Sequence, residues 1–125
     1  MKVSRCILIL TSENPERLYS FYRETIGLPE AVGSGPGAGQ PGGAVQAAGV
    51  TIIIEGHSET AGDAKEPQRH LMDLHVDDLV TEEQRLLDLG VQFVRLGELE
   101  EWGGTIATFL DPDGNYLQLI EEPRE

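Results

Sequence analysis

The sequence contains few of the features that define several large classes of protein. Its one cysteine, Cys6, excludes an intramolecular disulfide and a zinc site built from cysteines. Only 9 basic residues stand against 22 acidic ones, giving a net charge of −13, which argues against binding to nucleic acid or anionic membranes. No apolar run is long enough to span a membrane or to form the core of a signal peptide, so we expect a cytoplasmic protein.

Length and apolar content set the size of the expected core. With 125 residues, 39% of them hydrophobic and 6% aromatic, the chain predicts one domain, residues 1–125, with a core of modest size. Cys6 stands in an apolar run that ends at Leu10. We therefore expect its thiol to be buried like any small apolar side chain.

The first half of the chain predicts a strand followed by a helix. Residues 3–11 form the apolar strand. In Asn14-Pro15-Glu16, an N-cap residue precedes a proline at the first helical position and an acid in the first turn. Apolar residues then follow at helical spacing, and Gly27 is expected to end the helix.

The second half repeats this plan. Residues 71–77 predict a strand, and Thr81 with Gln84 has the spacing of a capping box. Gly90 ends the predicted helix, 63 residues after Gly27 (90 − 27). The chain therefore predicts module one at 1–56, a polar linker at 57–69 and module two at 70–125.

Strand-like segments follow the helix in each module. In order they are residues 44–48 and 50–55 in module one, and 91–96, 104–110 and 116–120 in module two. A further strand expected near 29–32 should be short, because residues 33–43 are rich in glycine and proline.

The stretch FLDPDGNYLQLIEE, residues 109–122, predicts a β-hairpin. Pro112 presets φ for the turn, Asp113 can bond nearby backbone, and Gly114 can adopt a positive φ. Alternation in the second strand places Tyr116, Gln118 and Ile120 on one face and the leucines between them on the core face.

Three stretches carry a resemblance to a known group. They are NPERLYSFYRETIGL, the unit that runs from HLMDLHVDDL to LLDLGVQF, and FLDPDGNYLQLIE. Taken in order, they resemble the vicinal oxygen chelate superfamily, which includes glyoxalases, bleomycin-resistance proteins and extradiol dioxygenases, and in particular small bacterial glyoxalase-like domains. The resemblance implies an α+β fold of two βαβββ modules. Their mixed sheets would form an open cup with the helices on the outer face.

The resemblance also implies where a metal ion would be held. Metal-dependent members use four side chains, and the matching positions here are Ile7, Glu55, Leu71 and Gln118. Two are aliphatic and one is a neutral amide, whereas divalent ions need converging nitrogen and oxygen donors. We therefore expect no cofactor and no family-type metal. An ion held in spite of this would be bound by Glu55, Gln118 and His75.

A face rich in both apolar and polar groups predicts a small-molecule pocket. Its expected members are Ile7, Glu55, Leu71, Asp73, His75, Trp102, Tyr116 and Gln118. Asp73 and His75 either form a polar wall with acid–base capacity or lie solvated at the rim. Trp102 is either a flap over the ligand or a satellite of the core.

Two classes of function remain open from the sequence. The first is a metal-free binding protein for a small organic molecule. In the bleomycin-resistance branch, an acidic, aromatic groove sequesters a cationic drug. The second is a lyase, isomerase or dioxygenase of the same superfamily, either metal-dependent or with Asp73, His75 or Glu55 as acid–base groups. In both cases relatives of this size imply a homodimer.

Overall fold

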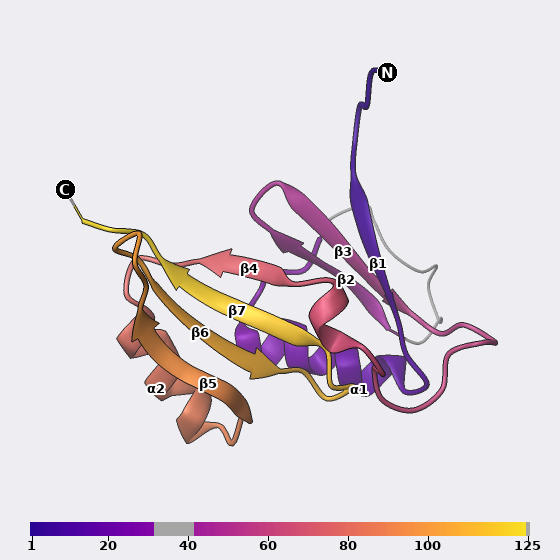
Figure 1. Ribbon diagram of the computed structural model, residues 1–125. Helices are drawn as coiled ribbons and strands as arrows, with labels where there is room; N and C mark the ends of the chain where they lie inside the picture. The colour runs from indigo at the N-terminus through magenta and orange to yellow at the C-terminus, as the bar shows by residue number, and fades with distance from the viewer. Residues whose placement is uncertain (32–41, 125) are drawn as a thin grey trace. The chain divides into compact units, whose positions relative to one another are not determined.

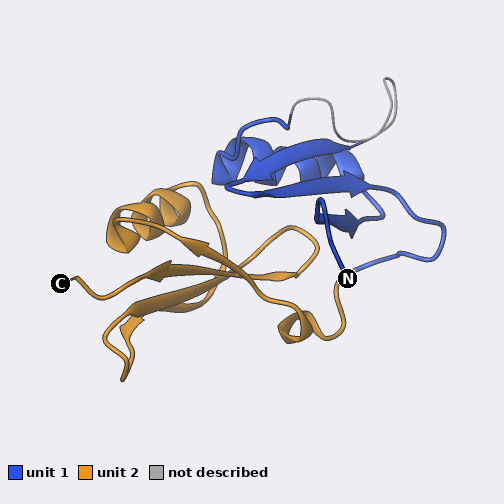
Figure 2. Cartoon of the chain, turned by 90° about the horizontal axis from the view of Figure 1, so that it is seen from above, with its two compact units in different colours: residues 1–62 blue, residues 63–125 orange. Residues whose placement is uncertain are grey.

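The chain divides into two compact units, residues 1–62 and 63–125 (Figure 2). The computed structural model describes residues 1–31 and 42–124. The boundary after Gly62 falls inside the segment predicted as the linker, residues 57–69. In each unit a helix packs on one face of a small mixed sheet (Figures 1 and 2).

Unit 1 is built on a three-stranded sheet. Its elements are β1 (Ile7–Thr11), α1 (Pro15–Ser20), the π-helix η1 (Phe21–Ile26), β2 (Gly43–Ala47) and β3 (Val50–Glu55). The strand order is β1-β3-β2, with β1 parallel and β2 antiparallel to β3. In the stretch predicted as a short strand, the structure describes one isolated bridge, Glu30 to Val45. Most of the glycine-rich segment 33–43 lies outside the described residues.

The first helix begins and ends where the sequence predicts. The Asn14 side chain accepts a hydrogen bond from the Arg17 amide at 3.2 Å, and Pro15 is the first helical residue. Gly27, with φ of 92°, ends η1 in the left-handed conformation. Leu18 and Tyr22 are fully buried, and α1 packs against β2 and β3.

The start of the chain corrects the prediction for Cys6. β1 begins at Ile7, four residues later than the predicted start of the strand, and Cys6 is exposed. The reason is that β1 is an edge strand whose first paired residue is Ile7, opposite Thr51. Without a paired neighbour strand, the residues before Ile7 have no sheet to pack into.

Unit 2 is built on a four-stranded sheet. Its elements are the 3-10 helix η2 (Pro67–Arg69), β4 (Met72–His75), α2 (Leu79–Asp88), β5 (Phe93–Leu99), β6 (Thr105–Leu110) and β7 (Tyr116–Glu121). The strand order is β4-β7-β6-β5, and only the β4–β7 pair is parallel. The predicted βαβββ order of this module and the α+β class are confirmed.

The second helix starts earlier than its predicted capping box. Asp78, and not Thr81, is the N-cap: its carboxylate accepts from the Thr81 amide at 3.1 Å and from the Thr81 hydroxyl at 2.7 Å. These bonds hold the pKa of Asp78 below its usual value, and the bond from the Thr81 hydroxyl has the larger effect. The earlier start brings Leu79 into the core, where it is 1% exposed. Gly90, with φ of 83°, follows the helix as predicted.

The sheet of unit 2 has two different faces. The helix face packs against α2 and carries Ala107, Phe109, Leu117 and Leu119, all buried. The residues that alternate with these form the opposite face, which we call the open face. Gln118 lies there, opposite Thr108 on β6, so the predicted alternation along β7 is confirmed.

The hairpin turn is held by one carboxylate. Gly114 has φ of 79°, and its amide donates to the Asp111 carbonyl at 3.0 Å. Asp111 makes two bonds to the backbone of the turn: its Oδ1 accepts from the amides of Asp113 and Asn115, both at 2.9 Å. Asp111 precedes both amides and can therefore fold its side chain over them, as in an Asx turn.

Gly114→Val is expected to lower the free energy of unfolding by about 1–3 kcal/mol, because a branched side chain is strained at positive φ. Pro112→Ala should cost less, since the proline acts mainly on the unfolded chain. Gly49→Val is the matched control, because Gly49 has no positive φ and no atom near an added Cβ. Denaturant melts in which the two valine variants lose equal stability would contradict the role given to Gly114.

Candidate functional site

Four polar residues lie side by side across the open face of unit 2. The strand register pairs Asp73 on β4 with Gln118 on β7, Gln118 with Thr108 on β6, and Thr108 with Arg95 on β5. We call Asp73, Gln118, Thr108 and Arg95 the polar row. Paired residues on neighbouring strands have Cβ atoms about 5 Å apart, so the row forms one continuous polar band across the sheet.

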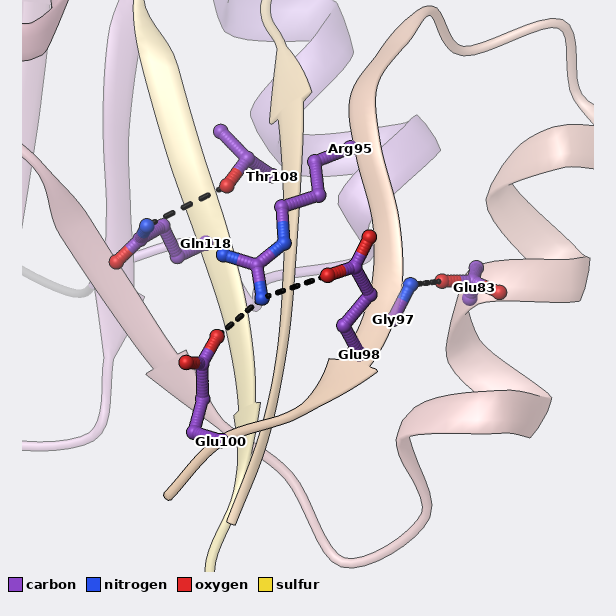
Figure 3. A network of polar contacts seen from close by, with 7 residues as sticks. All are labelled: Glu83, Arg95, Gly97, Glu98, Glu100, Thr108 and Gln118. Carbon is purple, nitrogen blue, oxygen red and sulfur yellow. Dashed lines mark hydrogen bonds and ion pairs between the residues drawn. The ribbon is translucent and has the colours of Figure 1, made fainter. Parts of the chain in front are cut away.

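The centre of the polar row is a hydrogen-bonded pair. Gln118 Nε2 donates to Thr108 Oγ1 at 3.3 Å, and Thr108 is buried (Figure 3). This long bond uses one of the two amide hydrogens of Gln118. Its carbonyl oxygen and the hydroxyl hydrogen of Thr108 are further bonding groups on this part of the face.

Arg95 at one end of the row is held by two carboxylates. Its Nη2 donates to Glu100 Oε1 and lies 3.5 Å from Glu98 Oε2 (Figure 3). The hydrogen bond that Arg95 donates to Glu100 and the two negative charges raise the pKa of Arg95 above its usual value. The guanidinium therefore keeps its positive charge, which is compensated by the two carboxylates. With two negative charges beside one positive charge, this end of the row carries a net negative charge.

The residues predicted on module two mostly lie in or beside the row. Asp73, His75, Tyr116 and Gln118 are on β4 and β7, with Asp73 and His75 exposed. His75 Nδ1 lies 3.8 Å from Glu122 Oε1. Leu71 lies one residue before β4 and is about half exposed.

Three further predicted residues lie elsewhere. Trp102 follows β5, is half exposed and lies against Gly104, where a Cβ would come within 2.0 Å of the indole ring. Ile7 and Glu55 belong to unit 1, at the first position of β1 and the last of β3. They are therefore placed by a different sheet from the polar row.

The sequence did not predict two members of the row, Arg95 and Thr108, or the two carboxylates that hold Arg95. Strict alternation from Phe93 would place Arg95 on the helix face, and a threonine in a strand carries no distinct signal. The unusual feature available was a charged residue inside the apolar run FVRL.

In the part of the chain that the structure describes, no group of three or more His, Cys, Asp or Glu residues lies close enough together to hold an ion. Within those same residues, no helix is both long and apolar enough to cross a membrane.

A βαβββ module with a helix on one face of its sheet, preceded in the chain by a second module of related order, is consistent with the glyoxalase fold. Residues 7–120 match the family model described as the glyoxalase-like domain. The chain belongs to this family.

Relatives agree with this assignment. A bleomycin resistance protein from Klebsiella pneumoniae is 40% identical over 55 residues, a match that spans 38% of this chain and 44% of that protein. The antibiotic-binding protein TnmS3 from Streptomyces sp. CB03234 superposes with a TM-score of 0.71 at 23% identity over 98% of both chains. A superfamily member from Sphaerobacter thermophilus gives 0.68 at 21%, again over 98% of both chains. At these identities the structural matches show the fold alone.

Proposed function

We propose that the open face of unit 2 binds a small organic molecule and does so without a metal ion. The observation that carries the proposal is the polar row. Four polar side chains in register on four strands provide a set of donors and acceptors, while the other face of the same sheet is apolar and buried. A few fixed polar groups beside apolar residues are typical of ligand sites.

Charge favours a cationic ligand. The row and its neighbours carry three acidic side chains, Asp73, Glu98 and Glu100, and one basic side chain, Arg95. The whole chain has a net charge of −13. The names of two similar proteins, a bleomycin resistance protein and an antibiotic-binding protein, support a drug-like ligand. Metal-free bleomycin is therefore the first probe to test.

Titration calorimetry with bleomycin tests the proposal. Wild-type protein should bind, and Gln118→Ala should weaken binding by roughly tenfold through the loss of a hydrogen-bonding group at the centre of the row. Gln84→Ala is the matched control, because Gln84 lies on α2, away from the open face, and its side chain donates to Asp88 on the same helix. Equal affinities for the two variants would contradict binding at the row.

An enzymatic role is the alternative, and the position of His75 favours it. The imidazole lies on the same strand as Asp73 and 3.8 Å from the Glu122 carboxylate, so two carboxylates are close to a group that can transfer protons. In a lyase or isomerase these side chains would move a proton. Turnover of a glutathione hemithioacetal that is lost in His75→Gln would establish this role, and no turnover at any pH would exclude it for that substrate.

The purified protein is expected to hold no stoichiometric divalent ion. Ile7 and Leu71 stand at two of the positions that metal-dependent relatives use, and neither side chain can coordinate. Elemental analysis after exposure to zinc, nickel, manganese and iron decides the matter. About one tightly bound ion per chain, lost in Glu55→Ala, would show the expectation to be wrong.

A two-fold homodimer is expected at micromolar concentration. Ile7 and Ile9 on the edge strand β1 are exposed, and an edge strand with apolar side chains favours association. Sedimentation velocity should report a dimer, and Ile9→Glu should shift it toward monomer. Val80→Glu, at an exposed site on α2, is the control. A wild-type monomer would contradict the expectation.

A further inference from the structure

Two irregularities in β5 flank Arg95. Phe93 pairs with Phe109, but Arg95 pairs with Thr108, so β5 advances two residues while β6 advances one. From Arg95 to Glu98 the strand advances three residues while β6 advances two, to Ile106. Each shift places one extra residue in β5, as in a β-bulge.

These bulges decide which face Arg95 and Glu98 occupy. In a regular strand Arg95 would share the helix face with Phe93, whose partner Phe109 is fully buried. The first extra residue turns Arg95 to the open face, opposite Thr108. The second brings Glu98 to the same face, where its carboxylate reaches the guanidinium. Bulges of this kind re-aim side chains at functional sites.

The second bulge is anchored from the helix. The Gly97 amide lies inside it and donates to Glu83 Oε2 on α2 at 2.6 Å (Figure 3). A Cβ at Gly97 would come within 2.8 Å of a Leu79 methyl and 3.2 Å of Glu83 Oε2. Glycine is therefore needed for α2 to approach this strand closely enough for the bond to form.

We propose that Glu83 is a positioning residue of the open-face site. Through its bond to Gly97 it fixes the bulge that holds Arg95 and Glu98 together at the end of the polar row. This inference rests on the proposed function only where it treats the polar row as a ligand site. The role of Glu83 in holding Arg95 can be tested without a ligand, because the Nε of Arg95 is buried and has no hydrogen-bond partner in the structure. That nitrogen is a direct reporter of how firmly the side chain is held.

The test follows the Arg95 Nε–H signal by NMR, assigned with Arg95→Lys. Glu83→Ala and Glu83→Asp, which remove or shorten the acceptor, should speed its exchange with water by roughly tenfold through local opening. Glu83→Gln retains an oxygen acceptor and should preserve the wild-type rate. Glu82→Ala removes the same charge from the preceding residue of α2, where the carboxylate pairs with Arg85, and should leave the rate unchanged.

Bleomycin affinity, measured on the same variants, separates the two proposals. Weaker binding in Glu83→Ala and Glu83→Asp, with rescue in Glu83→Gln, supports both. Wild-type protein that fails to bind bleomycin contradicts the proposed ligand, while the Arg95 signal still decides the role of Glu83. An unchanged exchange rate in Glu83→Ala and Glu83→Asp overturns the positioning role whether or not bleomycin binds.

Discussion

Leu86→Ala is expected to lower the free energy of unfolding by about 2–5 kcal/mol. Leu86 is 1% exposed and lies on the face of α2 that packs against β5, β6 and β7. Truncation would remove its buried methyl groups and leave a cavity that the sheet, fixed by its hydrogen bonds, fills only in part.

Leu89→Ala is the matched control for this prediction. Leu89 follows the same helix but is 58% exposed, so its truncation should change the free energy of unfolding by less than about 1 kcal/mol. Both variants are measured by denaturant melts. Equal losses of stability would mean that α2 does not dock on the sheet through the face that carries Leu86.

Asp111→Ala is expected to lower the free energy of unfolding by about 2–4 kcal/mol, because three donors would lose the carboxylate that accepts their hydrogen bonds. Asp111 is 4% exposed, and its carboxylate accepts from the amides of Asp113 and Asn115 and from the Asn115 side chain at 2.8 Å. The Asp113 amide is in a buried residue and has little access to water as a substitute. Asn115 is partly exposed, which limits the total cost.

Asp111→Asn should lose about half as much in the same denaturant melts. The asparagine keeps one oxygen for the two backbone amides but cannot accept from the Asn115 side chain. Asp88→Ala, at an exposed site near the end of α2, removes an equal charge and should be close to neutral. An Asp111→Ala variant as stable as Asp88→Ala would contradict the role of this carboxylate in the turn.

The order of elements was predictable because its signals are local. Asn14 and Pro15 start a helix, and Gly27, Gly90 and Gly114 adopt positive φ, through the conformational preferences of those residues themselves. Alternation along β7 was equally readable, since a regular strand turns successive side chains to opposite faces. The family resemblance rested on these same local patterns.

Other features depended on partners distant in the sequence. Cys6 is exposed because, among the described residues, the pairing of β1 with β3 begins only at Ile7, and α2 begins at Leu79 because that side chain is needed in the core. Asp111 stabilises the turn because its side chain folds forward over the amides of Asp113 and Asn115. Each outcome depends on packing or geometry that local preference does not specify.

The sequence by itself determined the element order, the turn and the alternation that puts Asp73 and Gln118 on one face of the sheet. Only the tertiary structure decided that Thr108 and Arg95 complete the row with them. The reason is the two bulges in β5. A bulge shifts the side-chain alternation of every residue after it, and its position depends on contacts with a neighbouring strand and helix, which no local pattern contains.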